Sequence, residues 1–325
     1  AGGSVFGQVL QPDGNLVLVG NFTTANGGGR TRVLRLGGST AVLTILDDES
    51  QNIPSGSTDT LFSPGSGANN FVQAMALQTN GSVIIGGDFT QFNSVTRGRL
   101  ARLSANGALD ASFLASGSGF NGTIRALGLQ LDGRLLVGGA FTTVNGTNRN
   151  YIVRLNTDGA IDSSFNPGAG ADNPLNSIAL YTNGTFNGRI IIGGTFATFN
   201  GTARNFVARL NTDGSLDGTF NIGTGANSAV QAVAIQTDGK VLVGGDFTSF
   251  NGISKGNLIR LNTDGSVDTA FNSAGVGANS SVRVITLQSD SRILIGGLFT
   301  NYNATTTRFI ARLNSDGTLD SSFNT

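Results

Sequence analysis

One internal repeat of about fifty residues runs through the chain and constrains the fold more than any other feature. The clearest copy is VQAVAIQTDGKVLVGGDFTSFNGISKGNLIRLNTDGSVDTAFN, residues 230–272. Its Gly-Gly step recurs at spacings of 52, 55, 51 and 52 residues, at Gly86, Gly138, Gly193, Gly244 and Gly296. Val19-Gly20 stands at the equivalent place of a first copy. Repeats of this length predict units that each form one small element and bury their faces against their neighbours.

Turn sequences divide each unit into four expected β-strands. In the clearest copy, a first strand over residues 230–236 ends at Asp238-Gly239, a dipeptide typical of tight hairpin turns. The second, residues 240–247, is apolar almost throughout, as in a strand covered on both faces. After a loop come a third strand over residues 257–261, a second Asp-Gly turn, and a short fourth strand around residues 267–271. No part of the unit has helical periodicity.

Six such units predict an all-β fold, a six-bladed β-propeller of four-stranded antiparallel blades. We expect a single propeller domain over residues 1–325. The six units are expected at about residues 1–62, 63–113, 114–166, 167–221, 222–272 and 273–325. The first unit is longer than the others because of an irregular insertion at about residues 37–57.

Two phenylalanine positions recur in all six units and are expected to fill the space between blades. They are Phe22, Phe89, Phe141, Phe196, Phe247 and Phe299, and Phe62, Phe113, Phe165, Phe220, Phe271 and Phe323.

Two charged positions also recur in every unit. The arginines of the Arg-Leu step are Arg35, Arg102, Arg154, Arg209, Arg260 and Arg312. The aspartates of the Asp-x-x-Phe step are Asp59, Asp110, Asp162, Asp217, Asp268 and Asp320. Six identical sets are a poor arrangement for catalysis, because an active site breaks symmetry. We interpret them as structural pairs or caps, with contact to a ligand as the alternative.

A third position is basic in five units and lies in the expected loop between the second and third strands. Its members are Arg30, Arg97, Arg149, Arg204 and Lys255, with Thr307 in the last unit. Because connecting loops run over the surface and carry function, these residues are the better candidates for a repeated binding contact.

The composition excludes several kinds of chemistry. The sequence has no histidine and no cysteine, so Ser-His-Asp and Cys-His triads and thiolate metal sites cannot form. The 20 basic and 20 acidic residues balance, so we expect neither nucleic acid nor direct membrane insertion among its interactions. No catalytic residue is assigned. Among the acidic residues outside the repeated sets, Asp172 is the main solitary one.

An acidic cluster within the insertion is the one weak candidate for a cofactor site. Asp47, Asp48 and Glu49 are adjacent, and their carboxylates could help to ligate Ca²⁺, which takes oxygen ligands. Adjacent residues in a strand point to opposite faces, however, which favours a solvated strand end. No other cofactor or metal is expected.

The coupled steps Q-x-D-G, G-G-D-F-T, R-L-N-x-D-G and D-x-x-F-N make the repeat similar to the delta-60 repeats of bacterial propeller-forming proteins. That resemblance covers nearly the whole chain and implies one module of a large secreted or surface-attached bacterial protein. Separately, TAVLTILDDE at Thr40–Glu49 resembles the last strand of a Calx-beta domain, a β-sandwich module. Neither resemblance implies a catalytic residue in this sequence.

These features favour an extracellular or cell-surface structural or binding module that is not an enzyme: a scaffold, an adhesin or a filament subunit. Its expected partners are other surface proteins, further copies of itself or glycans. A carbohydrate-binding propeller is the alternative, which the lack of tryptophan and the presence of only 3 tyrosines weaken. A glycan-active hydrolase or lyase is the third candidate.

Overall fold

The computed structural model describes residues 62–114 and 117–323, and in the first repeat the backbone of strands between Val5 and Leu36. This part of the chain folds into strands and turns, with one short 3₁₀ turn at Gly184–Phe186. No helix in it is long and apolar enough to cross a bilayer. The insertion at residues 37–57, and with it the Calx-beta-like strand at Thr40–Glu49, lies outside the described residues.

Each repeat forms one propeller blade that consists of a three-stranded antiparallel sheet and a separate two-stranded hairpin. We call the first strand of each blade its inner strand. The inner strands are β1 (Val5–Leu10), β6 (Val72–Leu77), β11 (Ile124–Leu129), β16 (Leu175–Leu180), β21 (Val230–Ile235) and β26 (Val282–Leu287). The second strands are β2 (Leu16–Gly20), β7 (Val83–Gly87), β12 (Leu135–Gly139), β17 (Ile190–Gly194), β22 (Val241–Gly245) and β27 (Ile293–Gly297). The third strands are β5 (Val33–Leu36), β10 (Leu100–Leu103), β15 (Ile152–Leu155), β20 (Val207–Leu210), β25 (Leu258–Leu261) and β30 (Ile310–Leu313).

The hairpins connect the second and third strands, where the sequence predicted only a loop. Their strands are β3 and β4 (Thr24–Ala25, Gly28–Gly29), β8 and β9 (Gln91–Phe92, Val95–Thr96), β13 and β14 (Thr143–Val144, Thr147–Asn148), β18 and β19 (Thr198–Phe199, Thr202–Ala203), β23 and β24 (Ser249–Phe250, Ile253–Ser254), and β28 and β29 (Asn301–Tyr302, Thr305–Thr306).

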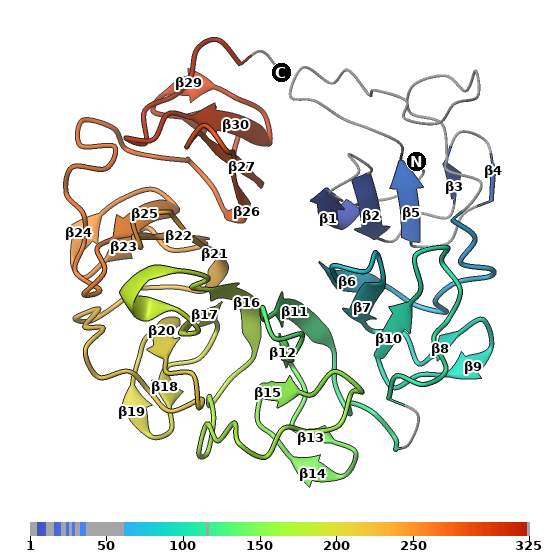
Figure 1. Ribbon diagram of the computed structural model, residues 1–325. Coiled ribbons are helices and arrows are strands. Elements are labelled where there is room, and N and C mark those ends of the chain that lie inside the picture. The colour runs from blue at the N-terminus through green and yellow to red at the C-terminus, as the bar shows by residue number, and fades with distance from the viewer. Residues whose placement is uncertain are drawn as a thin grey trace. The chain divides into compact units, whose positions relative to one another are not determined.

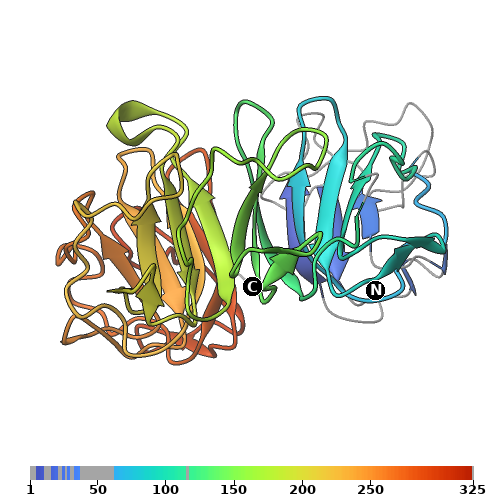
Figure 2. The same ribbon diagram turned by 90° about the horizontal axis from the view of Figure 1, so that it is seen from below.

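The chain divides into two compact units, residues 1–149 with 154–162 and residues 150–153 with 163–325. Blades 1 to 3 make up most of the first unit and blades 4 to 6 most of the second. Within the second unit, the inner strands β16, β21 and β26 follow one another at one end of their sheets, and the hairpins lie at the other end (Figure 1). Between β16 and β17, the turn that holds Gly184–Phe186 is longer than its counterparts and projects from its blade (Figure 2).

In blades 2 to 5 every residue of the central strand is buried, as the apolar second run predicted. In blade 5 the sheet order is β21-β22-β25, and every residue of β22 is buried. The Asp238-Gly239 turn is also confirmed, because Gly239 adopts a φ of 82° and donates its N–H to the Gln236 carbonyl at 2.9 Å. A positive φ at that position costs glycine less than any other residue, because glycine has no Cβ atom.

The expected fourth strand is reduced to a single bridge. In blade 5 the bridge pairs Leu261 with Val267. The chain then turns, because Asp268 Oδ1 accepts a hydrogen bond from the Ala270 N–H at 3.1 Å. A side chain that bonds its own backbone two residues on competes with the sheet ladder for that backbone, so the strand ends there.

The recurring phenylalanines form the core between blades. The phenylalanines that follow the second strands are fully buried: Phe89, Phe141, Phe196, Phe247 and Phe299. The side chains of the Asp-x-x-Phe step are at most 2% exposed at Phe62, Phe113, Phe165, Phe220 and Phe271. The burial prediction is wrong for Phe323, which is only half-buried. Phe271 lies against Gly317 of the next blade, and no corresponding glycine covers Phe323 within the described residues. Phe22 lies outside the described residues.

Candidate functional site

The repeated arginine and aspartate meet in every blade whose side chains are described. The Nε–Oδ2 distances are 2.8 Å for Arg102–Asp110, 2.7 Å for Arg154–Asp162, 2.6 Å for Arg209–Asp217, 2.8 Å for Arg260–Asp268 and 2.7 Å for Arg312–Asp320. Their interpretation as structural pairs is confirmed for these blades; the side chains of Arg35 and Asp59 lie outside the described residues.

The same arginines also connect neighbouring blades. Nη1 of Arg102 donates to the Thr157 carbonyl at 2.7 Å, and Nη1 of Arg209 and of Arg260 reaches the corresponding turn carbonyl at 2.5 and 2.6 Å. Because one guanidinium carries several donors in a fixed planar geometry, it can hold the aspartate and the next blade together. The pair therefore ties the third strand to the following turn and to the next repeat.

A second cation shares the aspartate in blades 3 to 6. This cation is the residue that follows the turn between the inner and second strands. It is Arg134, Arg189, Lys240 or Arg292, and it lies 3.6, 2.5, 2.8 and 3.3 Å from the carboxylate, respectively. Burial raises the pKa of Asp217, but hydrogen bonds from the Thr219 hydroxyl and amide and from Arg209 outweigh it, so the pKa lies below the ordinary value. A carboxylate held ionised in this way is unsuited to act as a general acid at neutral pH.

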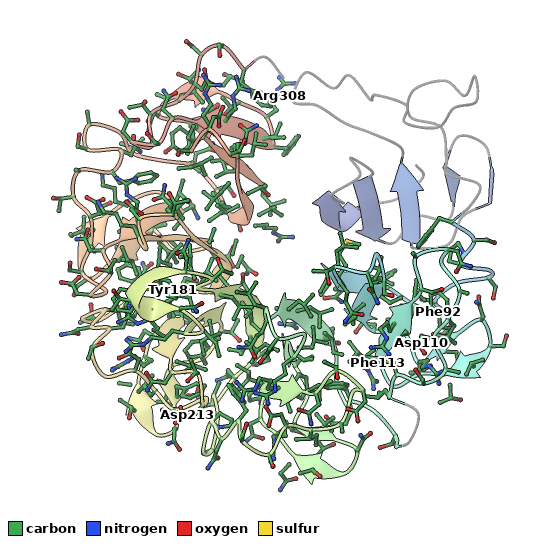
Figure 3. All side chains as sticks on the ribbon, in the orientation of Figure 1. Phe92, Asp110, Phe113, Tyr181, Asp213 and Arg308 are labelled. Carbon is green, nitrogen blue, oxygen red and sulfur yellow. The ribbon has the colours of Figure 1, made fainter. Side chains whose placement is uncertain are left out.

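Aromatic rings cover the guanidinium groups. The Arg102 guanidinium lies 4.5 Å from the centroid of the Phe113 ring. Phe113 and Asp110 lie close together in blade 2 (Figure 3). In blade 4 the long turn adds a second ring, so the Arg209 guanidinium lies 4.4 Å from Phe186 and 4.7 Å from Phe220. Cation–π contacts of this kind strengthen as the cation loses water. Blade 4 therefore has the most fully enclosed arginine of the described blades.

The basic loop residues turn back onto the chain's own backbone. Each lies directly after the second strand of a hairpin. The Nη1 atoms of Arg97, Arg149 and Arg204 donate to the carbonyl of the preceding residue at 3.1, 2.8 and 2.8 Å. Lys255 Nζ instead donates to the carbonyls of Asn272 and Gly275, at 2.8 and 3.3 Å. Their role in binding stays a prediction, and Arg30 lies outside the described residues.

Asp172 occupies a position that is asparagine in the four other described blades. Those residues are Asn69, Asn121, Asn227 and Asn279, and each Oδ1 accepts hydrogen bonds from two backbone N–H groups at the start of the hairpin. Asp172 Oδ1 likewise accepts from the Ala197 N–H at 2.9 Å. Burial raises the pKa of Asp172, but the Thr198 and Ala197 hydrogen bonds outweigh it and lower the pKa. This solitary carboxylate has the geometry of a cap.

One set of residues, at β-bulges, is not apparent from the sequence. In every blade the register between the inner and second strands shifts at the second residue of the inner strand. This residue differs between blades: Phe6, Gln73, Arg125, Asn176, Gln231 and Arg283. Bulges redirect side chains and are common beside binding sites. A one-residue register shift leaves no signal in the sequence, which is why only the structure reveals this set.

The bulge residues of blades 2 and 5 make the same polar contact, with the aspartate that follows the Gly-Gly step. Gln73 Nε2 donates to Asp88 Oδ2 at 2.6 Å, and Thr123 of the next blade donates to the other oxygen of Asp88. Gln231 Nε2 donates to Asp246 Oδ2 at 2.7 Å. Arg283 is exposed. The bulges therefore place an amide group beside a carboxylate in blades 2 and 5 and an exposed guanidinium group in blade 6.

Within the described residues, no group of three or more acidic side chains is arranged to hold a metal ion. The weak calcium candidate, Asp47, Asp48 and Glu49, lies outside those residues.

Comparison with solved structures shows the fold. A gluconolactonase from Xanthomonas campestris is similar at a TM-score of 0.53 and 13% identity, over 91% of this chain and 83% of that one. A streptogramin B lyase is similar at a TM-score of 0.52 and 14% identity, over 97% and 81%. At such identity the likeness concerns the fold alone. No curated protein matches the sequence.

A family model of repeated propeller segments matches the chain six times. The matches fall at residues 11–37, 78–113, 130–165, 187–220, 236–271 and 288–323, one in each repeat and more than half of the chain in total. The six-bladed propeller expected from the sequence is thus supported by both the strands and the family. The chain belongs to the β-propeller family described as domain of unknown function DUF5122.

Proposed function

We propose that this chain is an extracellular or cell-surface module that binds or organises other molecules and has no catalytic centre. One observation carries the proposal. The arginines and aspartates that recur through the described blades hold one another and the backbone, and even the solitary Asp172 caps a hairpin. Acid–base catalysis needs a group whose pKa is tuned towards the working pH, and the pKa values of Asp217 and Asp172 are shifted in the opposite direction.

The expected partners follow from the surface chemistry. The neutral charge balance favours other surface proteins, further copies of the chain, or glycans over nucleic acid. The resemblance to delta-60 repeats of bacterial surface proteins supports the same cellular location. We expect the bulge residues, above all the exposed Arg283, and the basic loop residues to make the contacts.

Self-assembly and binding to surface proteins can be tested on the purified chain. If the chain self-assembles, light scattering and negative-stain electron microscopy are expected to detect filaments or ordered oligomers. If it binds other surface proteins, pull-down with defined surface proteins is expected to give saturable binding. Arg283→Ala should weaken the interaction, whereas Leu131→Ala, a change of a residue that is 81% exposed in a turn, serves as the matched control. A strictly monomeric chain that binds no surface protein would contradict the scaffold role.

A carbohydrate-binding module is the second candidate, supported by the mixed amide and carboxylate groups beside the bulges. Few large aromatic side chains are exposed for stacking on sugars: within the described residues, Phe71 and Phe309 are 39% and 57% exposed. A glycan array separates the two candidates. Binding that Gln231→Ala or Arg283→Ala abolishes would favour the carbohydrate module over the scaffold.

A glycan-active hydrolase or lyase is the least favoured candidate. The two similar solved structures are named as a gluconolactonase and a lyase, but the similarity to them is one of fold, and propellers carry many unrelated functions. A turnover screen that includes sugar lactones and glycosides is expected to find no activity.

A further inference from the structure

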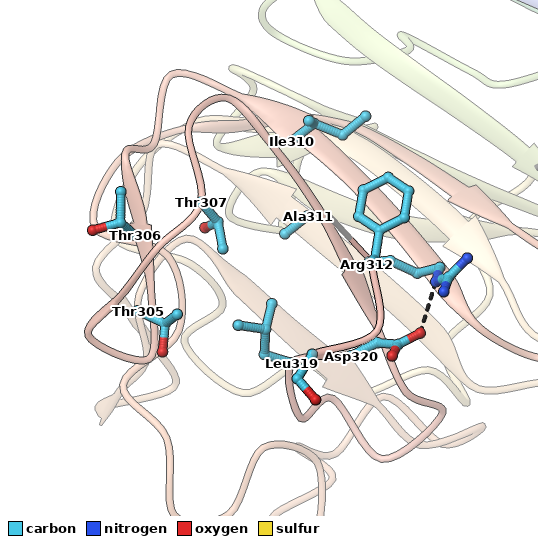
Figure 4. A pocket seen from close by; sticks show the side chains of 10 residues that line it. Thr305, Thr306, Thr307, Ile310, Ala311, Arg312, Leu319 and Asp320 are labelled. Carbon is cyan, nitrogen blue, oxygen red and sulfur yellow. Dashed lines mark hydrogen bonds and ion pairs between the residues drawn. The ribbon is translucent and has the colours of Figure 1, made fainter. Parts of the chain in front are cut away.

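The repeated Arg–Asp pair shows how polar side chains of the described blades are bonded to neighbours, and in blade 6 Arg312 Nε donates to Asp320 at 2.7 Å (Figure 4). Asparagines that precede a glycine can be compared in the same way, because this pair of residues is chemically labile. The carboxamide carbon of an asparagine can be attacked by the backbone nitrogen of the next residue, and a glycine leaves that nitrogen uncrowded. The described residues contain eight such steps, which begin at Asn80, Asn106, Asn121, Asn145, Asn183, Asn187, Asn200 and Asn251.

At six of the eight steps the asparagine Oδ1 atom accepts a hydrogen bond from a backbone N–H group. The asparagines and the residues that donate to them are Asn80 and Ser82, Asn106 and Ala108, Asn121 and Thr142, Asn145 and Gly119, Asn200 and Ala169, and Asn251 and Thr224, at 3.0, 3.1, 2.8, 2.8, 3.0 and 3.2 Å. A carboxamide held in this way must break its hydrogen bond before its carbon can turn toward the nitrogen that follows.

The two remaining steps lie in the long turn of blade 4, where both asparagines are exposed. At Asn187 the following nitrogen is engaged, because the Gly188 N–H donates to the Tyr181 carbonyl at 2.8 Å. At Asn183 neither group is engaged. Within the described part of the chain, no hydrogen bond is formed by the Asn183 side chain or by the Gly184 N–H. Asn183-Gly184 is therefore the one step of the eight in which both reacting groups are unbonded.

The turn around Gly184 is also open to water. Asn183, Gly184 and Thr185 are exposed, and a Cβ atom placed on Gly184 would meet nothing within 4 Å. Phe186 anchors the following part of the turn, because its ring lies 4.4 Å from the Arg209 guanidinium. The turn projects from its blade (Figure 2). The unbonded step therefore lies just before the anchored part of the turn.

We propose that Asn183 is a site of spontaneous covalent modification, at which the Asn183-Gly184 step converts to aspartate and isoaspartate. The Gly184 nitrogen loses its proton and forms a bond to Asn183 Cγ. The bond from Cγ to Nδ2 breaks, and Nδ2 takes up a proton and leaves as ammonia. Water then opens the resulting succinimide ring at either of its carbonyl carbons. The conversion consumes one water molecule, releases one ammonia molecule and needs no enzyme or oxidant.

The modification changes the charge of the projecting turn. Arg189 is the only charged residue among residues 181–189, so one new carboxylate brings the net charge of this segment from positive to neutral. Where isoaspartate forms, the backbone before Gly184 is also one carbon atom longer. This inference goes beyond the proposed function, because it concerns a chemical change of the chain itself and depends on no binding partner.

The test is incubation of the purified, folded chain in mildly alkaline buffer, which favours loss of the proton from the attacking nitrogen. Peptide mapping by mass spectrometry measures conversion at each asparagine, and an isoaspartate-specific methyltransferase detects the isomerised product. Asn187 is the matched control, since it is exposed in the same turn and differs in the hydrogen bond of the next nitrogen. We expect Asn183 to convert at least tenfold faster than Asn187 and than each of the six bonded asparagines.

The same chain unfolded in urea shows whether the fold is responsible. There the hydrogen bonds are lost, so all eight steps are expected to convert at similar rates. In the folded Asn183→Gln variant the rapidly formed product should be absent, because the glutamine side chain would have to close a larger ring. The proposal is overturned if any of the other seven asparagines converts as fast as Asn183 in the folded chain. A tenfold preference for Asn183 that persists in urea would overturn it as well, because local sequence would then explain the reactivity.

Discussion

At the scale of single residues, the aspartate of the Asp-x-x-Phe step uses its two oxygens for different purposes. Asp217 Oδ1 accepts from the Thr219 N–H at 2.9 Å and ends the fourth strand, while Oδ2 accepts from Arg209 Nε at 2.6 Å. The Arg209 and Asp217 side chains are 1% and 3% exposed. One side chain thus sets the local turn and neutralises an enclosed cation, so this position tolerates little change.

Asp217→Asn is therefore expected to be strongly destabilising. Removing one charge of a buried ion pair costs about 3–5 kcal/mol, because the remaining charge stays desolvated. Asp110→Asn, at an aspartate whose side chain is 27% exposed, should cost about 1 kcal/mol or less, as for other accessible pairs. Urea unfolding at pH 7 measures both. Equal losses for the two variants would show that burial of the pair does not determine its contribution.

The same carboxylates should make the protein sensitive to acid. Hydrogen bonds from the Ser112 hydroxyl and amide, together with Arg102, outweigh partial burial and lower the pKa of Asp110 from 3.8 to about 2. A group with a depressed pKa in the folded state stabilises the fold above its unfolded pKa and loses that effect as the pH falls through its folded pKa. We expect the urea midpoint to be constant above about pH 5 and to fall between about pH 4 and pH 2. A midpoint that stayed flat to pH 2 would contradict the assigned pairs.

Asp172 offers a rescue experiment at the residue scale. The other capping residues are asparagines whose Nδ2 reaches a threonine hydroxyl, for example Asn121 to Thr142 at 2.9 Å, and blade 4 has Ala197 in place of that threonine. Asp172→Asn should cost about 1 kcal/mol or less at pH 7, because the new amide lacks this partner. Adding Ala197→Thr should recover the loss. A double variant no more stable than the single one would show that the asparagine geometry is not transferable to blade 4.

At the scale of elements, turn chemistry and apolar periodicity predict the long strands but not the short ones. The buried run of β22 and the Asp238-Gly239 turn follow from residue types, because packing and positive φ restrict which residues fit. The hairpin strands have two residues each, which is too few to show any periodicity. In blade 5 the fourth strand is cut short because the Asp268 side chain binds the backbone that would continue it. Of the candidate site, the repeated arginines and aspartates were visible in the sequence, whereas the bulge residues depend on register and were not.

The phenylalanine that follows the second strand of each blade packs between neighbouring sheets. Phe247 is fully buried and lies in a cluster with Phe250, Val230 and Val243. Phe247→Ala should cost about 3–5 kcal/mol, through lost transfer free energy and the cavity that remains. Leu131→Ala, at an 81% exposed residue, should stay within about 0.5 kcal/mol and controls for general effects of truncation. A loss below about 1 kcal/mol for Phe247→Ala would contradict its role in the core.

At the scale of the whole molecule, near-identical repeats distribute the charged residues evenly. Each described blade has its own Arg–Asp pair, so none of them is distinguished by these residues as a reactive centre. What does differ between blades is the bulge residue at the start of the inner strand, together with the residue after the Gly-Gly step. Repeated ion pairs with a variable residue at each bulge fit the proposed binding role better than a single reactive centre.

The measurement that tests this account most directly is a broad turnover screen of the purified chain and of its Asp172→Asn variant, with circular dichroism as the check on folding. Glycosides, lactones and polysaccharides are the substrates to include. We expect no turnover by either protein, because Asp172 is a hairpin cap, Asp110 and Asp217 are ion-pair partners, and the pKa of each of these three carboxyl groups lies below the ordinary value. Turnover by the parent chain that Asp172→Asn abolishes, with the fold intact, would contradict it and identify an enzyme.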